Sequence, residues 1–296
     1  MNSDVMAVGH LTRDQVQTVM RACAVAPPVR NKRPWRLICT PTALELRAEL
    51  PIAETSTNEP DHRELLLSCG AALLNVRATI RVLGVHPAVR LMPDEDQPDL
   101  LAVVHPRTGF AAAPADVALA EAIAQRRTSR PLTGGIPVPM INRLRQAARV
   151  EQTWLAILPP DQLGSVQLGH LDSDVDGHGG HDRTAVDGRA ADGRQPGARP
   201  NRLVAVIGSF HDAPLAWLQS GQGMQRVLLT ADAAGLTTSL LSHVVRAART
   251  RGQLRQLIGG GVWPQAVVRL ESPALPAPRS RSAAVPHETV HRSVNR

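Results

Sequence analysis

Residues 61–84 read DHRELLLSCGAALLNVRATIRVLG, and this stretch decides the fold. Its apolar side chains point in almost every direction around a helix, which is typical of a helix at the centre of a core. Asp61 is a plausible N-cap because Glu64 follows three residues later, as in a capping box. Gly84 supplies a stop signal. We therefore expect a core helix from Asp61 to about Leu83.

A second core helix is predicted at residues 219–234, which are also rich in small residues. Aligning Gly70 with Gly221 places Gly84 on Gly235, so both helices carry an early glycine and a glycine stop at the same spacing. Repeated units at fixed spacing indicate two similar halves fused in one chain, related by a pseudo-twofold axis.

The flanking segments follow the same plan, namely a helix, a strand, a core helix and further strand. From hydrophobic periodicity we expect helices at 11–25, 116–125, 138–149 and 251–258, and strands at 34–39, 88–92, 100–104, 154–158, 203–208 and 265–270. The predicted halves are residues 1–110 and 111–296.

Residues 170–200 interrupt the second half. They consist mainly of Gly, Asp, Arg and His and carry almost no apolar side chain. Such a composition cannot bury a core and predicts a mobile or disordered loop. The tail after Pro273, rich in Pro, Ser and Arg, is expected on the surface.

Length and composition allow a full-sized core, because 43% of the 296 residues are hydrophobic. No uninterrupted apolar run reaches the roughly 18 to 20 residues that cross a bilayer, and no secretory signal is visible. Cys23, Cys39 and Cys69 are odd in number and form no CxxC pair, which argues against a disulfide framework and a thiolate zinc site. These features predict a cytoplasmic protein that does not enter a membrane.

The net charge of +7 does not indicate a nucleic-acid partner. Lys32 is the only lysine, and the arginines are scattered along the chain. A nucleic-acid-binding surface would cluster its charge and usually offers aromatic side chains for stacking, whereas this chain has no Tyr and two Phe. We expect no nucleic-acid binding.

The loop at 170–200 contains an apparent calcium motif, with aspartates at 172, 174 and 176 before Gly177. An EF-hand loop needs a bidentate Glu at its twelfth position, and here that position is Arg183. His178 and His181 have no third ligand at a structured spacing. No metal site is predicted.

Other catalytic signatures are missing as well. No GxSxG elbow stands between a strand and a helix, which argues against a serine hydrolase of that type. The glycines at 259–261 match neither a Walker loop nor a dinucleotide fingerprint, and are better explained as the end of the preceding helix. We therefore assign no catalytic side chain.

Three polar segments are candidate binding elements. Residues 26–37 form a proline-stiffened loop that enters a strand and could bind a planar or anionic group, although a plain connection is equally consistent. Residues 125–132 carry three arginines and two hydroxyls, which suit a phosphate or simply a solvated surface. Residues 277–281, taken alone, would be a disordered basic end.

Together these segments resemble the nitroreductase family, specifically its Acg-like actinobacterial branch. The run from Ala26 to Arg36 is similar to the branch's A-P-S-x-x-N-x-Q-P-W-R flavin loop, and residues 126–130 are similar to the R-R-S-x-R phosphate motif. Residues 63–72, 217–221, 228–236 and 264–269 resemble further recurring segments of the branch. The likeness covers most of 11–170 and 201–290.

The resemblance implies an α+β fold with helices around antiparallel sheets, in which both halves of a flavin-binding dimer are packed into one chain. It implies FMN as the cofactor and NAD(P)H as the electron donor. The chain would be a monomer with an internal pseudo-twofold axis, or a weak homodimer.

The resemblance also implies the site residues. Arg126, Thr128 and Arg130 would hold the phosphate and ribityl chain, and Arg279 and Arg281 would add charge to the phosphate. The residues that would line the ring from the first half are Asn31, Arg33, Pro34, Trp35 and Arg36. The turn from Ser239 to Ser242, which includes Leu240 and Leu241, would present backbone N–H groups to the ring.

The chain departs from the family pattern at two loop positions and in one segment. Pro28 replaces the expected serine and removes both a hydroxyl and a backbone donor. Arg33 replaces the expected glutamine with a larger, charged group. Residues 170–200 do not resemble the structured stretch that the family carries there, which indicates a lost lid or a corrupted stretch of coding sequence.

Three functions follow from these observations. The first is an FMN-dependent NAD(P)H oxidoreductase that passes electrons to nitroaromatic or quinone-like acceptors. The second is a non-catalytic flavin-sequestering protein, because the Acg-like branch is thought in part to bind flavin behind a lid. The third is a degenerate member that folds but binds little, for which Pro28 and Arg33 are the indications.

Overall fold

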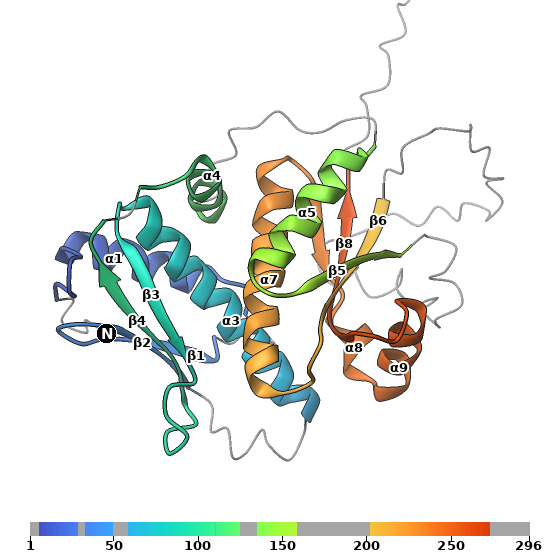
Figure 1. The fold of residues 1–296 in the computed structure, drawn as a ribbon, viewed down its shortest axis with the longest axis horizontal. Coiled ribbons are helices and arrows are strands. Elements are labelled where there is room, and N and C mark those ends of the chain that lie inside the picture. The colour runs from blue at the N-terminus through green and yellow to red at the C-terminus, as the bar shows by residue number, and fades with distance from the viewer. Residues whose placement is uncertain are drawn as a thin grey trace, which may run out of the picture.

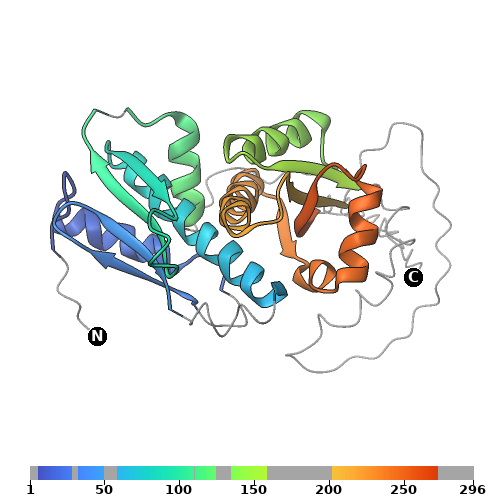
Figure 2. The ribbon, with the colours of Figure 1, turned by 60° about the horizontal axis from the view of Figure 1, so that its bottom comes forward.

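The computed structural model describes residues 6–28, 33–49, 59–109, 111–124, 135–158 and 202–272. Within these ranges two four-stranded antiparallel sheets lie on either side of two long helices, α3 (Glu59–Val82) and α7 (Pro214–Ala233), which cross between them (Figure 1). The predicted α+β class with antiparallel sheets is confirmed. The view in Figure 2 places α4 (Pro114–Ile123) and α5 (Val138–Val150) beside this central pair, whereas α9 (Ala248–Leu257) lies against β8 (Trp263–Glu271), away from it.

The first sheet has the strand order β1-β2-β4-β3. Its elements are α1 (Arg13–Ala24), β1 (Trp35–Cys39), β2 (Leu44–Ala48), α3 (Glu59–Val82), β3 (His86–Leu91) and β4 (Leu100–Arg107). Helix α1 begins with a capping box in which the Thr12 side chain accepts from the Gln15 backbone and the Gln15 side chain accepts from the Thr12 backbone.

The second sheet has the order β5-β6-β8-β7, which is the same order counted within the half. Its elements are α4 (Pro114–Ile123), α5 (Val138–Val150), β5 (Trp154–Leu158), β6 (Arg202–Ser209), α7 (Pro214–Ala233), β7 (Thr237–Leu240), α8 (Ser242–Arg246), α9 (Ala248–Leu257) and β8 (Trp263–Glu271). In each half the core helix follows the second strand. The boundary near residue 110 and the fusion of two halves stay predictions.

Hydrophobic periodicity did not predict three short elements, and it placed the start of α3 two residues too late. Strand β2 does alternate apolar and polar side chains and was overlooked, whereas β7 and α8, of four and five residues, carry no periodic apolar pattern. Helix α3 begins at Glu59, so Asp61 lies inside the first turn and is not the N-cap. An acidic side chain there still favours the helix, because the N-terminus carries partial positive charge.

The predicted glycine pair lies where α3 and α7 cross. A Cβ atom on Gly70 would stand 2.1 Å from the Leu218 carbonyl oxygen, and one on Gly221 would stand 2.0 Å from the Leu67 carbonyl oxygen. Each glycine therefore packs against the carbonyl three residues before the other glycine. Only residues without a Cβ permit this approach, and the reciprocal contacts are those expected from a local twofold relation.

Helix α3 is the one helix in the described ranges that could cross a membrane by length and composition, although no single apolar run predicted it. In its most apolar stretch 83% of the residues are buried inside the protein. This burial is typical of the core helix of a globular protein.

The cysteines contribute to packing in the first half. Cys23 and Cys69 are buried, and Cys39 is half-buried; all three are free thiols. Burial raises the pKa of the Cys23 thiol to about 12, which keeps it protonated at neutral pH. A buried neutral thiol behaves as a small apolar side chain.

Candidate functional site

A narrow pocket lies where the two halves meet, and we call it the junction pocket. Its lining combines the loop after α1, the start of α3, and α7, β7, α8 and β8 of the second half. The lining residues are Pro27, Pro28, Pro60, Arg63, Glu64, Leu67, Ser68, Met224, Leu240, Ser242, Val245, Arg246, Gln265 and Ala266. Its cavity volume is about 40 Å³, little more than the space of a water molecule.

Two side chains of α3 fix the loop that enters this pocket. The Ser68 hydroxyl donates to the Pro27 carbonyl oxygen at 2.5 Å. One residue further along the helix, the Cys69 thiol lies 3.8 Å from the Pro34 carbonyl oxygen, within reach of a weak hydrogen bond. The segment around Ser68 therefore holds both ends of the loop that begins at Pro27.

Arginines close the pocket on the side of α8. The Arg246 guanidinium bonds Asp61 at 2.6 Å and also pairs with Glu64, both on α3. Arg63 is 3% exposed and donates to the Val245 carbonyl oxygen at 2.5 Å. Burial lowers the pKa of Arg63, and the nearby Arg251 adds to this effect, but an arginine remains charged at neutral pH. Helix α8 is thus tied to α3 by two cations.

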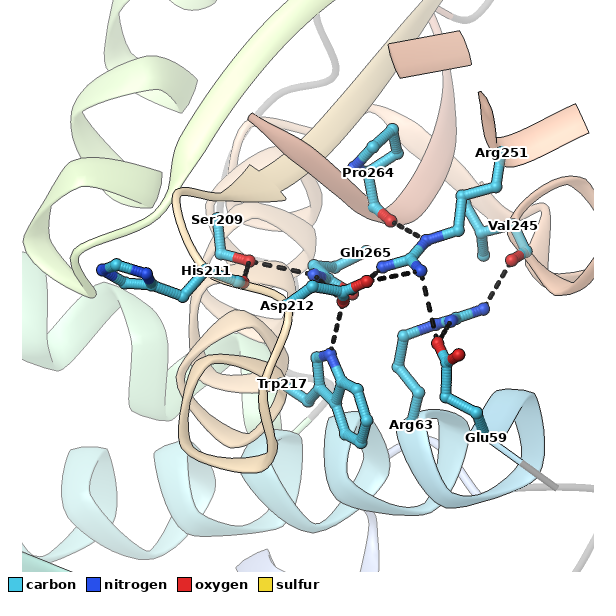
Figure 3. A network of polar contacts seen from close by, with 10 residues as sticks. All are labelled: Glu59, Arg63, Ser209, His211, Asp212, Trp217, Val245, Arg251, Pro264 and Gln265. Atoms are coloured by element: carbon cyan, nitrogen blue, oxygen red, sulfur yellow. Dashed lines mark hydrogen bonds and ion pairs between the residues drawn. The ribbon is translucent and has the colours of Figure 1, made fainter. Parts of the chain in front are cut away.

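A polar network supports the floor of the junction pocket, and Figure 3 shows its centre at Asp212 and Arg251. Arg251 forms a fork on Asp212 with N–O distances of 2.8 and 2.5 Å. The Trp217 indole and the Gln265 amide also donate to Asp212, at 2.7 and 3.1 Å. Burial of Asp212 favours its neutral form, yet these donors outweigh burial and lower its pKa.

This network gives a structural role to two of the recurring sequence segments. Trp217 opens the segment 217–221, and Gln265 lies in the segment 264–269. Gln265 is fully buried, lines the junction pocket and joins Ser209 to Asp212 and Arg251. The two segments are far apart in sequence, and both reach the Asp212 carboxylate in the folded chain.

A second, larger hollow adjoins the first, and we call it the helix pocket. Pro27 lines both pockets. Thr238 lines the helix pocket and Leu240 the junction pocket, and residues two apart on a strand share one face. The helix pocket has a cavity volume of about 520 Å³, within the usual range for small-molecule sites. The two pockets therefore follow one face of β7.

The helix pocket is bounded by three helices and has a polar floor. Ala122 and Ile123 come from the end of α4, directly before the arginine-rich segment 125–132. Asn75 of α3 and Gln225 of α7 line it as well. No sequence signal singled out this pair, because an isolated amide within an apolar helix has no motif.

The predicted site residues are distributed as follows. Leu240 lines the junction pocket, whereas Leu241 is buried in a small core cluster of the second half. Pro34 and Trp35 are buried and Arg33 and Arg36 are exposed, and none of these four lines either pocket. Asn31, Arg126, Thr128, Arg130, Arg279 and Arg281 lie outside the described residues, as do the whole loop 170–200 and the tail.

One backbone donor expected at the turn is engaged elsewhere. The Leu241 N–H donates to the Val267 carbonyl oxygen at 2.8 Å, extending the pairing of β7 with β8. Trp35 starts β1 with its side chain in the first-half core, where it hydrogen-bonds Cys23 and lowers that thiol's pKa slightly against the effect of burial. Sequence similarity cannot separate a side chain that lines a ligand from one that supports the loop beside it.

The described residues fit part of a flavin. The junction pocket offers apolar walls, a buried cation and a proline loop, a chemistry that suits one face of a planar ring, but its volume of about 40 Å³ is far smaller than such a ring and would have to widen. The helix pocket offers hydrogen-bond acceptors and enough volume for a polar chain. Among the described lining residues of the helix pocket there is no cation for a phosphate, so that charge would have to come from the arginine motifs. No group of His, Cys, Asp and Glu within the described ranges could hold a metal ion.

Comparison with curated proteins identifies relatives over almost the whole chain. The Mycobacterium tuberculosis protein named "Putative NAD(P)H nitroreductase Rv3131" is 29% identical over 92% of this chain and 91% of its own length. A second protein of that organism, "Putative NAD(P)H nitroreductase acg", is 24% identical over 88% of this chain and 89% of its own length. The resemblance seen in the motifs is therefore confirmed by relatives that bear the family name.

Two further comparisons, with protein-family models and with solved structures, add little to this finding. No protein-family model matches the chain. Among solved structures, the nitroreductase with bound FMN from Bacteroides fragilis NCTC 9343 covers 58% of this chain and 94% of its own, at 15% identity and a TM-score of 0.34. A TM-score of 0.34 does not establish a common fold.

Proposed function

We propose that this relative of the mycobacterial nitroreductases is an FMN-dependent NAD(P)H oxidoreductase. One observation carries the proposal. The loop at Pro27 and Pro28, from the first half, and the turn at Leu240 and Ser242, from the second, line one pocket between the halves. Pro27 and Pro28 belong to the loop, and Leu240 and Ser242 to the turn, that the family resemblance places at the flavin ring, one from each half.

Bound FMN would supply the redox chemistry by accepting hydride from NAD(P)H and passing electrons to a nitroaromatic or quinone-like acceptor. The chain's own residues would supply binding and electrostatics. Leu67, Met224 and Ala266 would exclude water from one side of the ring. Arg63, a buried cation in the pocket wall, would stabilise negative charge at that position.

The phosphate would be held by the arginine motifs. Arg126, Thr128 and Arg130 follow directly after α4, whose last turn lines the helix pocket. Guanidinium forks bind phosphate bidentately, and Arg279 and Arg281 would add charge from the tail. This arrangement would run the flavin from the helix pocket, past Pro27, to the junction pocket.

The test is an absorption spectrum of the full chain reconstituted with FMN and desalted, recorded anaerobically before and after NADPH is added. We expect a retained flavin band that NADPH bleaches, with electrons then recovered by an added quinone. A protein that retains no flavin would overturn the proposal and point to a degenerate member of the family.

Flavin sequestration is a second candidate, and the narrow junction pocket favours it. An electron acceptor needs an open face above the ring, whereas Arg246 ties α8 to Asp61 and Glu64 and leaves a cavity of about 40 Å³. A storage protein would retain a flavin band that NADPH leaves unchanged while dithionite bleaches it.

We further propose that the protein is cytoplasmic and acts as a monomer with two fused halves, residues 1–110 and 111–296, or as a weak homodimer. The matching strand orders of the two sheets and the reciprocal packing of Gly70 and Gly221 support the fusion. Sedimentation of the FMN-loaded protein tests the oligomeric state.

A further inference from the structure

A further pocket lies between α4, α5 and α7, and we call it the α5 pocket. It shares no described lining residue with the junction pocket or the helix pocket. Its cavity volume is about 260 Å³, just below the usual range for small-molecule sites, so it suits a small ligand. Most of the lining is apolar, and the polar side chains in it are Arg143, Gln146, Arg226 and Thr230.

Arg226 is a buried guanidinium with one unused donor group. The side chain is 8% exposed, and its Nε and Nη2 both contact the Glu151 carboxylate, at 2.8 and 2.7 Å. Its Nη1 has no partner among the described residues. Nη1 is also not one of the unpaired side-chain atoms that are sealed from solvent in these ranges. Because Arg226 lines the α5 pocket, this donor opens into it.

The ion cluster behind the pocket carries more positive than negative charge. Glu151 pairs with Arg77 at 2.6 Å as well as with Arg226, so two guanidinium groups share one carboxylate. Gln222, which also bonds Arg77, is neutral. A buried charge without a counter-charge is costly, and an anion in the α5 pocket would supply the missing negative charge.

The other polar groups of the lining favour an anion as well. Thr230 follows Arg226 by one turn of α7 and therefore lies on the same face of that helix. Arg143 of α5 is exposed and has no carboxylate partner among the described residues. No acidic side chain belongs to the described lining. Guanidinium and hydroxyl donors within apolar walls suit a carboxylate that is attached to an apolar body.

We infer that the α5 pocket binds a small aliphatic carboxylate of the fatty-acid class. Its carboxylate accepts hydrogen bonds from the Arg226 Nη1 and the Thr230 hydroxyl, while its chain packs against Ala118 of α4 and Ala147 of α5. The site is separate from the two pockets along β7 and does not depend on the proposed flavin chemistry.

The experiment titrates the full-length protein in a calorimeter with three probes. Octanoate has both the chain and the charge, octanol has the chain without the charge, and acetate has the charge without the chain. Arg226→Gln removes the buried donor. Arg143→Gln and Arg149→Gln form a matched pair, because both arginines are exposed on α5 and only Arg143 lines the pocket.

We expect octanoate to bind at least about tenfold more tightly than octanol or acetate, because only octanoate uses both the donors and the apolar walls. Arg226→Gln should weaken octanoate by about tenfold or more, the size of a lost hydrogen bond between charged groups. Arg143→Gln should weaken it by about two- to threefold, as for an exposed ion pair, and Arg149→Gln should not change it. Equal binding of octanoate and octanol, or equal losses in the two exposed variants, would overturn the inference.

Arg226→Gln also removes the contacts with Glu151, so its folding is checked by thermal unfolding. If it does not fold, Ala118→Leu tests the same site by filling the half-buried wall on α4. This variant should weaken octanoate by at least about fivefold and leave acetate within about twofold. Unchanged octanoate binding in Ala118→Leu would overturn the inference.

A final titration separates this site from the flavin site. Saturating FMN should leave the affinity for octanoate unchanged. Competition between FMN and octanoate would place the carboxylate in the flavin site and overturn the inference. A protein that binds octanoate but retains no FMN would overturn the proposed function alone.

Discussion

The connections that lead from a helix into the first strand of each sheet are the clearest difference between the two halves. In the first half, residues 25–34 join α1 to β1, whereas in the second half only residues 151–153 join α5 to β5. The long connection contributes Pro27 and Pro28 to the junction pocket. The short one contributes to neither pocket along β7. The same scaffold therefore carries a candidate site on one side only.

The space beside the short connection is used for a buried ion cluster instead. Glu151 is 6% exposed and binds Arg77 of α3 at 2.6 Å and Arg226 of α7 at 2.7 Å. Gln222 joins the cluster through Arg77 at 2.5 Å. In the first half, the connection forms part of the candidate site. In the second half, the ion cluster beside the connection ties α3 to α7.

Even the anchoring positions correspond. Ser68 on α3 holds the long connection through Pro27, and Gln219, at the matching position on α7, bonds Gln152 in the short connection at 3.2 Å. The two halves therefore share the arrangement of their cores and differ in their connections. Four changes test this interpretation, in order of decreasing expected effect.

The largest effect is expected at the helix crossing. Gly70→Ala and Gly221→Ala each place a Cβ about 2 Å from a backbone carbonyl oxygen, so the helices must separate. We expect each to lower the free energy of unfolding by about 4 kcal/mol, measured by urea denaturation. Gly252→Ala in α9, where a Cβ meets nothing within 4 Å, should instead stabilise by about 0.5–1 kcal/mol. Unequal losses for Gly70 and Gly221 would break the symmetric interpretation.

The next effect belongs to the second half alone. Glu151→Gln leaves the half-buried Arg77 and the buried Arg226 without a carboxylate, and should lower the free energy of unfolding by about 3 kcal/mol. A loss below about 1 kcal/mol would mean that the cluster does not lock the core helices.

The same cluster predicts a dependence on pH. Burial favours the neutral form of Glu151, but Arg77 and Arg226 outweigh burial and lower its pKa below the ordinary 4.5. A depressed folded-state pKa contributes stability above pH 4.5 that is lost as the pH falls through the folded value. The wild-type protein should therefore lose more stability on acidification below pH 4.5 than Glu151→Gln does, as followed by thermal unfolding.

Removing the side chain that anchors each connection should have a smaller effect on stability, and the effect on FMN binding should differ between the two connections. Ser68→Ala removes the donor to the Pro27 carbonyl oxygen and should cost about 1 kcal/mol of stability and weaken FMN binding several-fold. Gln219→Ala removes a bond between exposed groups of the short connection and should cost less than about 0.5 kcal/mol, with no change in FMN affinity. Equal flavin losses in both variants would show that the long connection is not special.

The smallest change in stability is expected at the pocket rim. Arg246→Gln breaks the partly exposed pairs with Asp61 and Glu64 and should cost about 1 kcal/mol or less. With one of its two ties to α3 removed, since Arg63 still bonds Val245, helix α8 should admit ligand faster, so stopped-flow mixing with FMN should give a higher association rate. An unchanged rate would mean that this clamp does not limit entry.

The sequence alone determined the parts of the molecule that depend on local pattern. The apolar periodicity located both core helices, and the matched spacing of Gly70 and Gly221 located the point where they cross. The loop and arginine motifs pointed to the nitroreductases, and the mycobacterial relatives of the chain bear that name. These features are readable because a helix face, a cap or a motif involves residues close together in the chain.

Which residues meet depends on how the helices and strands pack. Two short elements, β7 and α8, carry no periodic pattern of their own and form because neighbouring strands and helices hold them. The bond between Asn75 and Gln225 joins residues 150 positions apart, and the Gln225 Oε1, an acceptor with no partner among the described residues, becomes visible only once α3 and α7 are packed. Burial and pairing are properties of the packed chain, so no local pattern in the sequence could have revealed that acceptor.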